Sequence, residues 1–552
     1  MTAEGNLRHF KVVFPYEFGG QGEKELELAP VQKGPHPIEW DSRFPSFDLH
    51  PAVARTFIGA VAMMQGKLFD VPHLLYNNPY QQVYRSRCRF GPDNALWAEI
   101  TAKVEHGLPY VKFVLEYGYS SSARKELDLP AVPIDFTIKG CDVVIRFGKE
   151  ISRTISGDEI KIRLLDYSNM EEGQKQTVVG AFLFGNTQEE IEWGAKHDQF
   201  SLLTILAEKH TPVFAQSSDW KYTDKFGPIG ELLPEKVPTR EALVKKYGNY
   251  WGKFRRHPWE RPWLGCNPRP ADAGYQDDFA SMPKMRDIIV GGYPLMQGVV
   301  LRSILQEGCR PTHYREWNGY PVTVNNHPDL ILLHGKPHLR AGDWVDRLGK
   351  DWSRNDHKRE LSPDNKRYEG HDPEHWSINW LIGYALTTGD QWAVDQCHHM
   401  VELFLAEMTY DSGTYNDNPG TARNYGRTIL AACGLYLVTG RNDLKRRILD
   451  RTKVAISKIE ENHGTLKMSL LAPRYSDSRG HHWVPWEEST AAVALFCVYK
   501  CFGSVEALQT CKKMCKMIAD HGWIKTDQGY KIGYKPPYHV DGEPYLPEQV
   551  IG

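Results

Sequence analysis

The stretch Tyr368-Glu-Gly-His-Asp-Pro-Glu-His-Trp-Ser-Ile-Asn-Trp-Leu-Ile-Gly-Tyr-Ala-Leu-Thr-Thr-Gly-Asp390 begins polar, turns apolar and stops at a Thr-Gly pair. Asp372 stands where a helix N-cap belongs, and Pro373 stands at the first helical position. Apolar residues then recur at helical spacing, and Gly389 is a typical C-terminal stop. The pattern predicts a mostly buried helix whose N-terminal end is crowded by His371, Asp372 and His375.

Two later stretches repeat this design. Polar residues 415–427 lead into an apolar run that stops at Gly440, and residues 481–488 lead into a second run that stops at Gly503. The stops at Gly389, Gly440 and Gly503 are 51 and 63 residues apart, which is typical of a degenerate helical-hairpin repeat.

Each of the last two stops is followed by an amphipathic segment. The apolar stripe of the first consists of Leu444, Ile448, Ile456 and Ile459. That of the second consists of Val505, Leu508, Cys511, Cys515 and Ile518. Apolar helices belong inside such a repeat and amphipathic helices outside, so the three polar clusters are expected to meet at one end of a ring.

The first 220 residues indicate mainly β-structure, because short apolar or alternating runs recur there between Gly, Asn, Asp and Ser residues. The runs cover residues 9–14, 82–88, 96–101, 110–117, 134–138, 142–147, 159–164 and 177–184. Short strands at this spacing predict a sandwich or barrel. One helix, from about Pro51 to Phe69, is expected to interrupt them.

These patterns predict an α+β multidomain chain. An N-terminal antiparallel β-sandwich or barrel, residues 1–220, is followed by a helical ring, residues 286–552, that carries the active site. Residues 221–285 form a connector rich in Trp, Pro and Arg, where proline excludes a continuous helix.

The composition is that of an ordinary globular chain. Its 552 residues are 41% hydrophobic and 25% charged, and the net charge of −2 gives no basis for a nucleic-acid surface. No apolar run is long enough to span a membrane, so neither nucleic acid nor a membrane is expected as a partner. The chain as written has no signal peptide, which favours the cytoplasm, with secretion or a viral particle as the alternative.

No cofactor is expected from the sequence. The ten cysteines show no zinc or redox spacing. The alternative is a structural or catalytic divalent metal bound by His371 and His375, because a spacing of four residues places both side chains on one face of a helix.

The hairpins, with their Leu-Thr-Thr-Gly-Asp and Leu-Val-Thr-Gly-Arg turns, resemble those of (α/α) toroid carbohydrate-active enzymes, as does the helix that begins Gly-His-Asp-Pro-Glu-His-Trp-Ser. A β region before such a toroid resembles some polysaccharide lyases, including rhamnogalacturonan-lyase-like proteins. The resemblance covers roughly residues 285–525. It implies a carbohydrate polymer or oligosaccharide as the substrate, while the chemistry depends on the site itself.

A lyase acting on a uronic acid by β-elimination needs a base, cations beside the sugar carboxylate and a proton donor for the leaving oxygen. The polar clusters contain more His, Tyr, Arg and Asn than carboxylates, so a lyase is the first expectation. The expected catalytic residues are Tyr415, Tyr425, His371, His375, His482 and Glu488. The expected substrate-binding residues are Asp372, Trp376, Asn416, Asn418, Arg423, Arg427, His481 and Trp486.

Two other functions stay open. A glycoside hydrolase requires two carboxyl groups at a set separation, and the candidates are Asp372, Glu374, Asp417, Glu487 and Glu488. A non-catalytic carbohydrate-binding or virion-surface protein is the third possibility. Structural interpretations also compete, since Asp372 is a natural helix cap and Glu487 and Glu488 favour a helix N-terminus.

Overall fold

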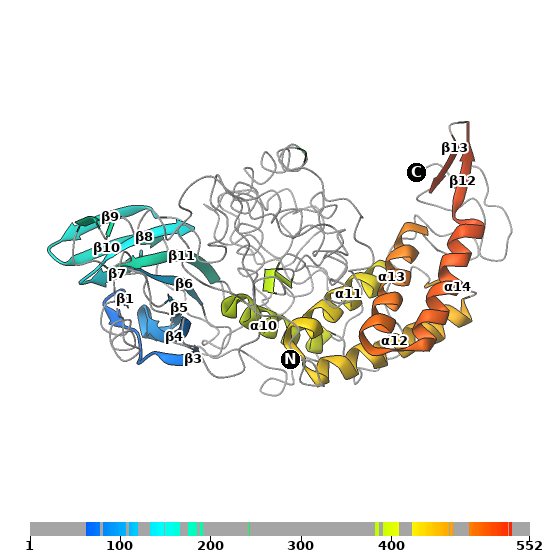
Figure 1. Cartoon of the computed structure of the whole chain (residues 1–552), viewed down its shortest axis with the longest axis horizontal. Helices are drawn as coiled ribbons and strands as arrows, with labels where there is room; N and C mark the ends of the chain where they lie inside the picture. The colour runs from blue at the N-terminus through cyan, green and yellow to red at the C-terminus, as the bar shows by residue number, and fades with distance from the viewer. Residues whose placement is uncertain are drawn as a thin grey trace, which may run out of the picture. The chain divides into compact units, whose positions relative to one another are not determined.

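The computed structural model describes residues 62–77, 81–105, 110–119, 133–147, 150–165, 175–184, 390–407, 422–462, 464–466, 485–527 and 529–532, and nine further residues at 188, 189, 191, 192, 242, 381, 382, 384 and 385 (Figure 1). The chain divides into two compact units, one with strands β1 to β11 and one with helices α10 to α14 and a last hairpin. The run predicted at residues 9–14, most of the connector and the start of the first hairpin lie outside the described residues.

The β unit contains two sheets. A six-stranded sheet has the order β3-β4-β5-β6-β11-β8, and a five-stranded sheet has the order β2-β1-β7-β10-β9. The strand pairs with a described register are antiparallel. The strands are β1 Ala62–Met64, β2 Lys67–Leu68, β3 His73–Asn77, β4 Gln81–Phe90, β5 Leu96–Glu105, β6 Tyr110–Tyr119, β7 Ile134–Lys139, β8 Asp142–Phe147, β9 Ser152–Ser156, β10 Glu159–Leu165 and β11 Lys175–Leu183.

An aromatic cluster connects the two sheets. Phe113 on β6 stacks on Phe182 of β11, with ring centroids 4.5 Å apart. Phe136 on β7, in the other sheet, lies 5.8 Å from Phe113 and 6.4 Å from Phe182. All three rings are buried, so residues of both sheets contribute to one buried aromatic cluster.

The helix predicted from Pro51 to Phe69 is wrong over its described part. Residues 62–68 form the hairpin of β1 and β2, with Met63 opposite Leu68 and Met64 opposite Lys67. The two loop residues, Gln65 and Gly66, have φ values of 46° and 77°, which is the left-handed backbone of a tight hairpin turn. Pairing of β1 with β7 overrides the helical spacing of the apolar residues. Strands β3 and β9 were also not predicted. The seven runs predicted from residue 82 onward are all confirmed as strands.

The helical unit contains α10 Gln391–Glu407, α11 Ala422–Thr439, α12 Asn442–Glu461, α13 Pro485–Phe502 and α14 Val505–His521 (Figure 1), followed by the hairpin of β12 Trp523–Thr526 and β13 Gly529–Ile532. The predicted stops of α11 and α13 are confirmed. Gly440 and Gly503 have φ values of 65° and 74°, which favour glycine. Their N–H groups donate to the carbonyl oxygens of Tyr436 and Tyr499, at 2.8 and 2.7 Å.

Helices α11 and α13 pack side by side and run in the same direction. Arg423 near the start of α11 contacts Glu487 at the start of α13, and the rings of Tyr436 and Phe502 near the two C-terminal ends lie 4.9 Å apart. Helices α12 and α14 each return along the helix before them. The starts of α11 and α13 therefore lie at the same end of the unit.

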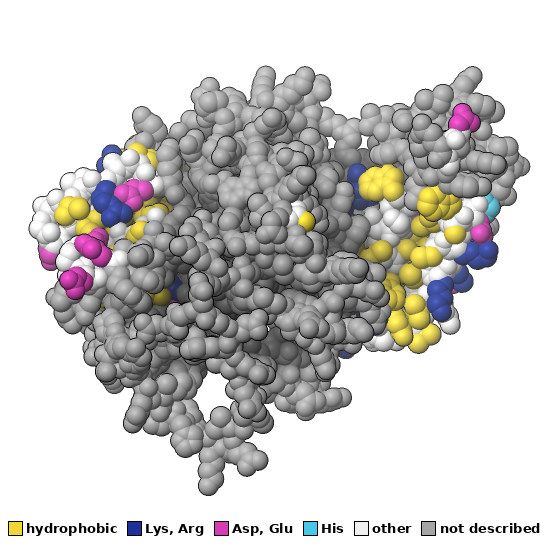
Figure 2. Space-filling view, turned by 45° about the horizontal axis from the view of Figure 1, so that its top comes forward, with side chains coloured by type: hydrophobic (Ala, Val, Ile, Leu, Met, Phe, Trp, Pro, Cys, Tyr) yellow, Lys and Arg dark blue, Asp and Glu magenta, His cyan; other side chains and the backbone are white. Residues whose placement is uncertain are grey.

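The amphipathic helices confirm one predicted stripe and correct part of the other, in which Cys511 is buried as predicted. Leu444, Ile448, Ile456 and Ile459 are all buried on α12, as predicted. On α14 the buried residues are Ala507, Thr510, Cys511, Met514 and Met517. Val505 is 58% exposed and Cys515 is exposed, because the packed face of α14 is rotated toward the small and methionine side chains. Figure 2 shows hydrophobic side chains on the visible face of this unit and charged side chains along one edge.

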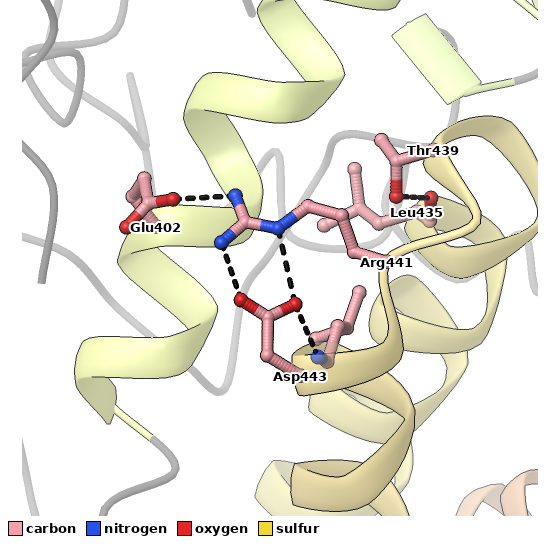
Figure 3. A network of polar contacts seen from close by, with 6 residues as sticks. Glu402, Leu435, Thr439, Arg441 and Asp443 are labelled. Carbon is pink, nitrogen blue, oxygen red and sulfur yellow. Dashed lines mark hydrogen bonds and ion pairs between the residues drawn. The ribbon is translucent and has the colours of Figure 1, made fainter. Parts of the chain in front are cut away.

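Arg441 joins α10 and α12 of this unit (Figure 3). Its guanidinium donates to Glu402 on α10 and makes two bonds to Asp443 at the start of α12, at 2.6 and 3.1 Å. Asp443 also accepts a hydrogen bond from the N–H of Leu444 at 2.8 Å, and the bond to Arg441 holds the pKa of its carboxyl below the usual range.

Candidate active site

Six of the candidate residues are described, and all six lie at the joined starts of α11 and α13. They are Arg423, Tyr425 and Arg427 on α11, and Trp486, Glu487 and Glu488 on α13. The other candidates lie outside the described residues and stay predictions: His371, Asp372, Glu374, His375, Trp376, Tyr415, Asn416, Asp417, Asn418, His481 and His482.

A glycine brings the two helices together at this point. A Cβ atom on Gly426 would lie 2.6 Å from Cγ2 of Thr490 and 2.7 Å from its carbonyl carbon, so only glycine fits between the backbones without displacement. Gly426 is not among the residues predicted for the site. A glycine inside a helical pattern was the available signal, because such a residue often marks a close approach.

Arg423 and Trp486 form the more exposed layer of the site. The guanidinium carbon of Arg423 lies 5.6 Å from the centroid of the Trp486 ring, within the range of a cation–π contact. Its Nη1 lies 3.8 Å from Oε1 of Glu487, and the two side chains are 16% and 1% exposed. The arginine cation therefore compensates the charge of a carboxylate that water hardly reaches.

Glu488 has a different environment from its neighbour. Its Oε2 accepts a hydrogen bond from the backbone N–H of Leu466 at 2.9 Å, and within the described residues its buried Oε1 has no hydrogen-bond partner. Burial raises the pKa of Glu488 well above the usual range; the Leu466 N–H opposes this effect, and the charge of Glu487 adds to it. The surroundings of Glu488 thus favour its protonated form next to a second carboxyl group.

Tyr425 is buried and bonded to the interior. Its hydroxyl donates to Oγ1 of Thr452 on α12 at 3.1 Å. Burial raises the pKa of Tyr425 far above its ordinary value, although the Thr452 bond and the nearby Arg451 oppose the rise. A general base needs the opposite shift, so this arrangement does not favour proton abstraction by Tyr425.

Arg427 lies one turn after Arg423 on α11, at the spacing that places two side chains on one helical face. It is buried. Two arginines thus belong to the same helix end as the carboxyl pair. Among the residues that the structure describes, no three His, Cys, Asp or Glu side chains are placed to hold a metal ion, and no helix is both long and apolar enough to cross a membrane.

Comparisons of the chain with protein-family models, curated proteins and solved structures gave no match.

Proposed function

We propose that the protein is a carbohydrate-active enzyme that cleaves an acidic polysaccharide or oligosaccharide, with Glu488 as the acid that protonates the leaving glycosidic oxygen. The observation that carries this proposal is the buried Glu488, whose pKa is raised by burial, beside the ion-paired Glu487. Two neighbouring titratable groups whose environments differ in this way are typical of acid–base catalysis.

The arginines and the tryptophan fit the substrate class. Arg423 and Arg427 offer planar donors that suit a uronate carboxylate. The part-buried indole of Trp486 offers an apolar surface against which a sugar ring can pack. We further propose that the described helices belong to an (α/α) toroid and that the two sheets, which precede it in the chain, form a β-sandwich. The helical-hairpin repeat and the shared aromatic core support this architecture.

Two reactions share the acid step and differ in the second group. In hydrolysis Glu487 is that group, the partner carboxylate of the acid. In β-elimination the second group is a base that removes the proton beside the uronate carboxylate, and Tyr415 is the remaining tyrosine candidate. Hydrolysis is the better supported reaction, because both carboxyl groups are present at one helix end. The arginine pair favours elimination as the second candidate.

The proposal is tested with a panel of acidic and neutral polysaccharides, each assayed for new reducing ends and for the absorbance of an unsaturated uronate. Hydrolysis yields reducing ends alone, whereas elimination yields both signals. The Glu488→Gln variant should lose activity in either case by about two orders of magnitude or more. The matched control is Glu506→Gln, which changes an exposed acid in the first turn of α14. A folded Glu488→Gln variant with full activity contradicts the proposal.

A further inference from the structure

The six-stranded sheet of the β unit has one apolar and one charged face. Side chains alternate along each strand, and the registers of β4, β5 and β6 are continuous. One face carries Phe90, Leu96, Ala98, Ile100, Phe113 and Leu115, all buried. The opposite face carries the arginines of β4 at every second position, Arg85, Arg87 and Arg89, together with Lys103, Lys112, Glu99, Glu105 and Glu116 of β5 and β6.

Two carboxylates of this charged face already bridge pairs of cations. One carboxylate oxygen of Glu99 lies 3.4 Å from Nε of Arg85, and the other lies 2.6 Å from Nε of Arg87. Further along β5, Glu105 lies 3.2 Å from Lys103 and 3.0 Å from Lys112. Each of these four cations therefore has a carboxylate neighbour within the sheet.

Arg89 does not share in these pairs. Directly across from it on β5 stands Trp97, and beyond Trp97 on β6 stands Gly118, so neither of these two neighbours is an acid. Within the described residues, the buried Nε and Nη1 atoms of Arg89 have no hydrogen-bond partner. Burial lowers the pKa of Arg89 to about 10, which still leaves the side chain charged at neutral pH.

A guanidinium without a partner is unfavourable when it is buried, because it has lost water and gained no compensating anion. Arg89 as a residue is only half-buried, although its Nε and Nη1 atoms are themselves buried. An anion with two or more oxygens satisfies the parallel N–H donors of arginine better than a monatomic anion does. The ion pair of Arg87 with Glu99 lies two residues away on the same face.

We propose that the Arg89 end of this charged face is a binding site for an oxyanion group, that is, a carboxylate, sulfate or phosphate carried by a ligand. The site lies in the β unit and does not depend on the chemistry proposed for α11 and α13. Arg89 binds the anion directly through its N–H groups, and Trp97 forms the adjacent apolar wall.

Direct binding to the full chain tests the site. Isothermal titration with inorganic sulfate, inorganic phosphate and glucuronate, at constant ionic strength in chloride, separates the three anion types. We expect saturable binding of at least one of them. Arg89→Gln should weaken it roughly tenfold or more, since hydrogen bonds between charged groups are strong. The control Arg153→Gln removes an arginine that is paired with Glu150 at 2.7 Å and should leave the affinity unchanged.

Two further variants make the result decisive. Arg423→Gln identifies any anion binding at the start of α11, so that failure here and failure of the proposed enzyme function are distinguishable. Arg89→Met should be at least as resistant to thermal unfolding as the wild type in the absence of oxyanions, because no internal partner is lost. Absence of binding by the wild type, an Arg89→Gln variant with unchanged affinity, or a destabilised Arg89→Met variant would each overturn the proposal.

Discussion

The hydroxyl of Tyr425 donates a hydrogen bond to Oγ1 of Thr452 at 3.1 Å, and this bond ties α11 to α12 inside the helical unit. The bond gives Tyr425 a structural role at the position where the sequence suggests a catalytic one. Of the two tyrosines predicted to be catalytic, we therefore expect only Tyr415 to take part in the reaction.

We therefore expect Tyr425→Phe to keep its activity and to lose about 0.5–1.5 kcal/mol of stability, the contribution of one buried hydrogen bond. Denaturant unfolding followed by far-ultraviolet circular dichroism measures the loss. The comparison variant is Tyr415→Phe, which should reduce turnover strongly if the reaction is an elimination. A Tyr425→Phe enzyme that folds normally but loses its turnover would restore the catalytic role.

The raised pKa of Glu488 predicts a pH dependence of stability. An unfolded glutamate releases its proton at a pH of about 4.3, whereas the folded protein keeps the proton to higher pH. The folded state then binds more protons, so this group's contribution to stability falls as pH rises from that value to the folded pKa. The slope is at most about 1.4 kcal/mol per pH unit.

Glu488→Gln should flatten this dependence, because glutamine does not titrate. Urea unfolding at a series of pH values from about 5 to 8 compares the variant with the wild type and with Glu506→Gln. If the wild type and Glu488→Gln have the same pH profile, the carboxyl group is not protonated in the folded protein.

Gly426→Ala should destabilise the helical unit by about 1–3 kcal/mol, the usual effect of forcing an extra methyl group into a packed interface. The added atom meets the backbone of Thr490 and Ala491 at less than 3 Å. Gly434→Ala is the control, because its Cβ would meet only side-chain atoms of Ile382, the nearest at 3.0 Å. Equal unfolding midpoints for the two variants would show that α11 and α13 are less closely packed than the structure indicates.

Arg441→Ala should destabilise the unit by about 1 kcal/mol or more, because it removes hydrogen bonds to two carboxylates and leaves both without this partner. The side chain is 22% exposed, so solvent screens only part of the effect. Lys453→Ala is the matched control. Lys453 is 72% exposed and 4.0 Å from Asp450, and such exposed pairs contribute about 0–1 kcal/mol. A loss no larger than that of the control would contradict the bridging role of Arg441.

The sequence by itself determined the elements with a strong local signal. Alternation of apolar residues predicts most described strands, and the apolar face of α12 follows from a spacing of three and four residues. Gly440 and Gly503 end their helices because their positive φ angles suit glycine. These features depend on neighbours close in the chain, so local spacing is sufficient to predict them.

Only the tertiary structure decided how those elements are used. The hairpin at Gln65 and Gly66 replaces a predicted helix because pairing with β7 outweighs local spacing. The contact of Arg423 with Glu487 requires the starts of α11 and α13 to lie together, although these two residues are 64 positions apart in the chain. The raised pKa values of Glu488 and Tyr425 result first from desolvation. Desolvation is set by which side chains the fold brings around a group, and that is why residue type and spacing alone did not predict it.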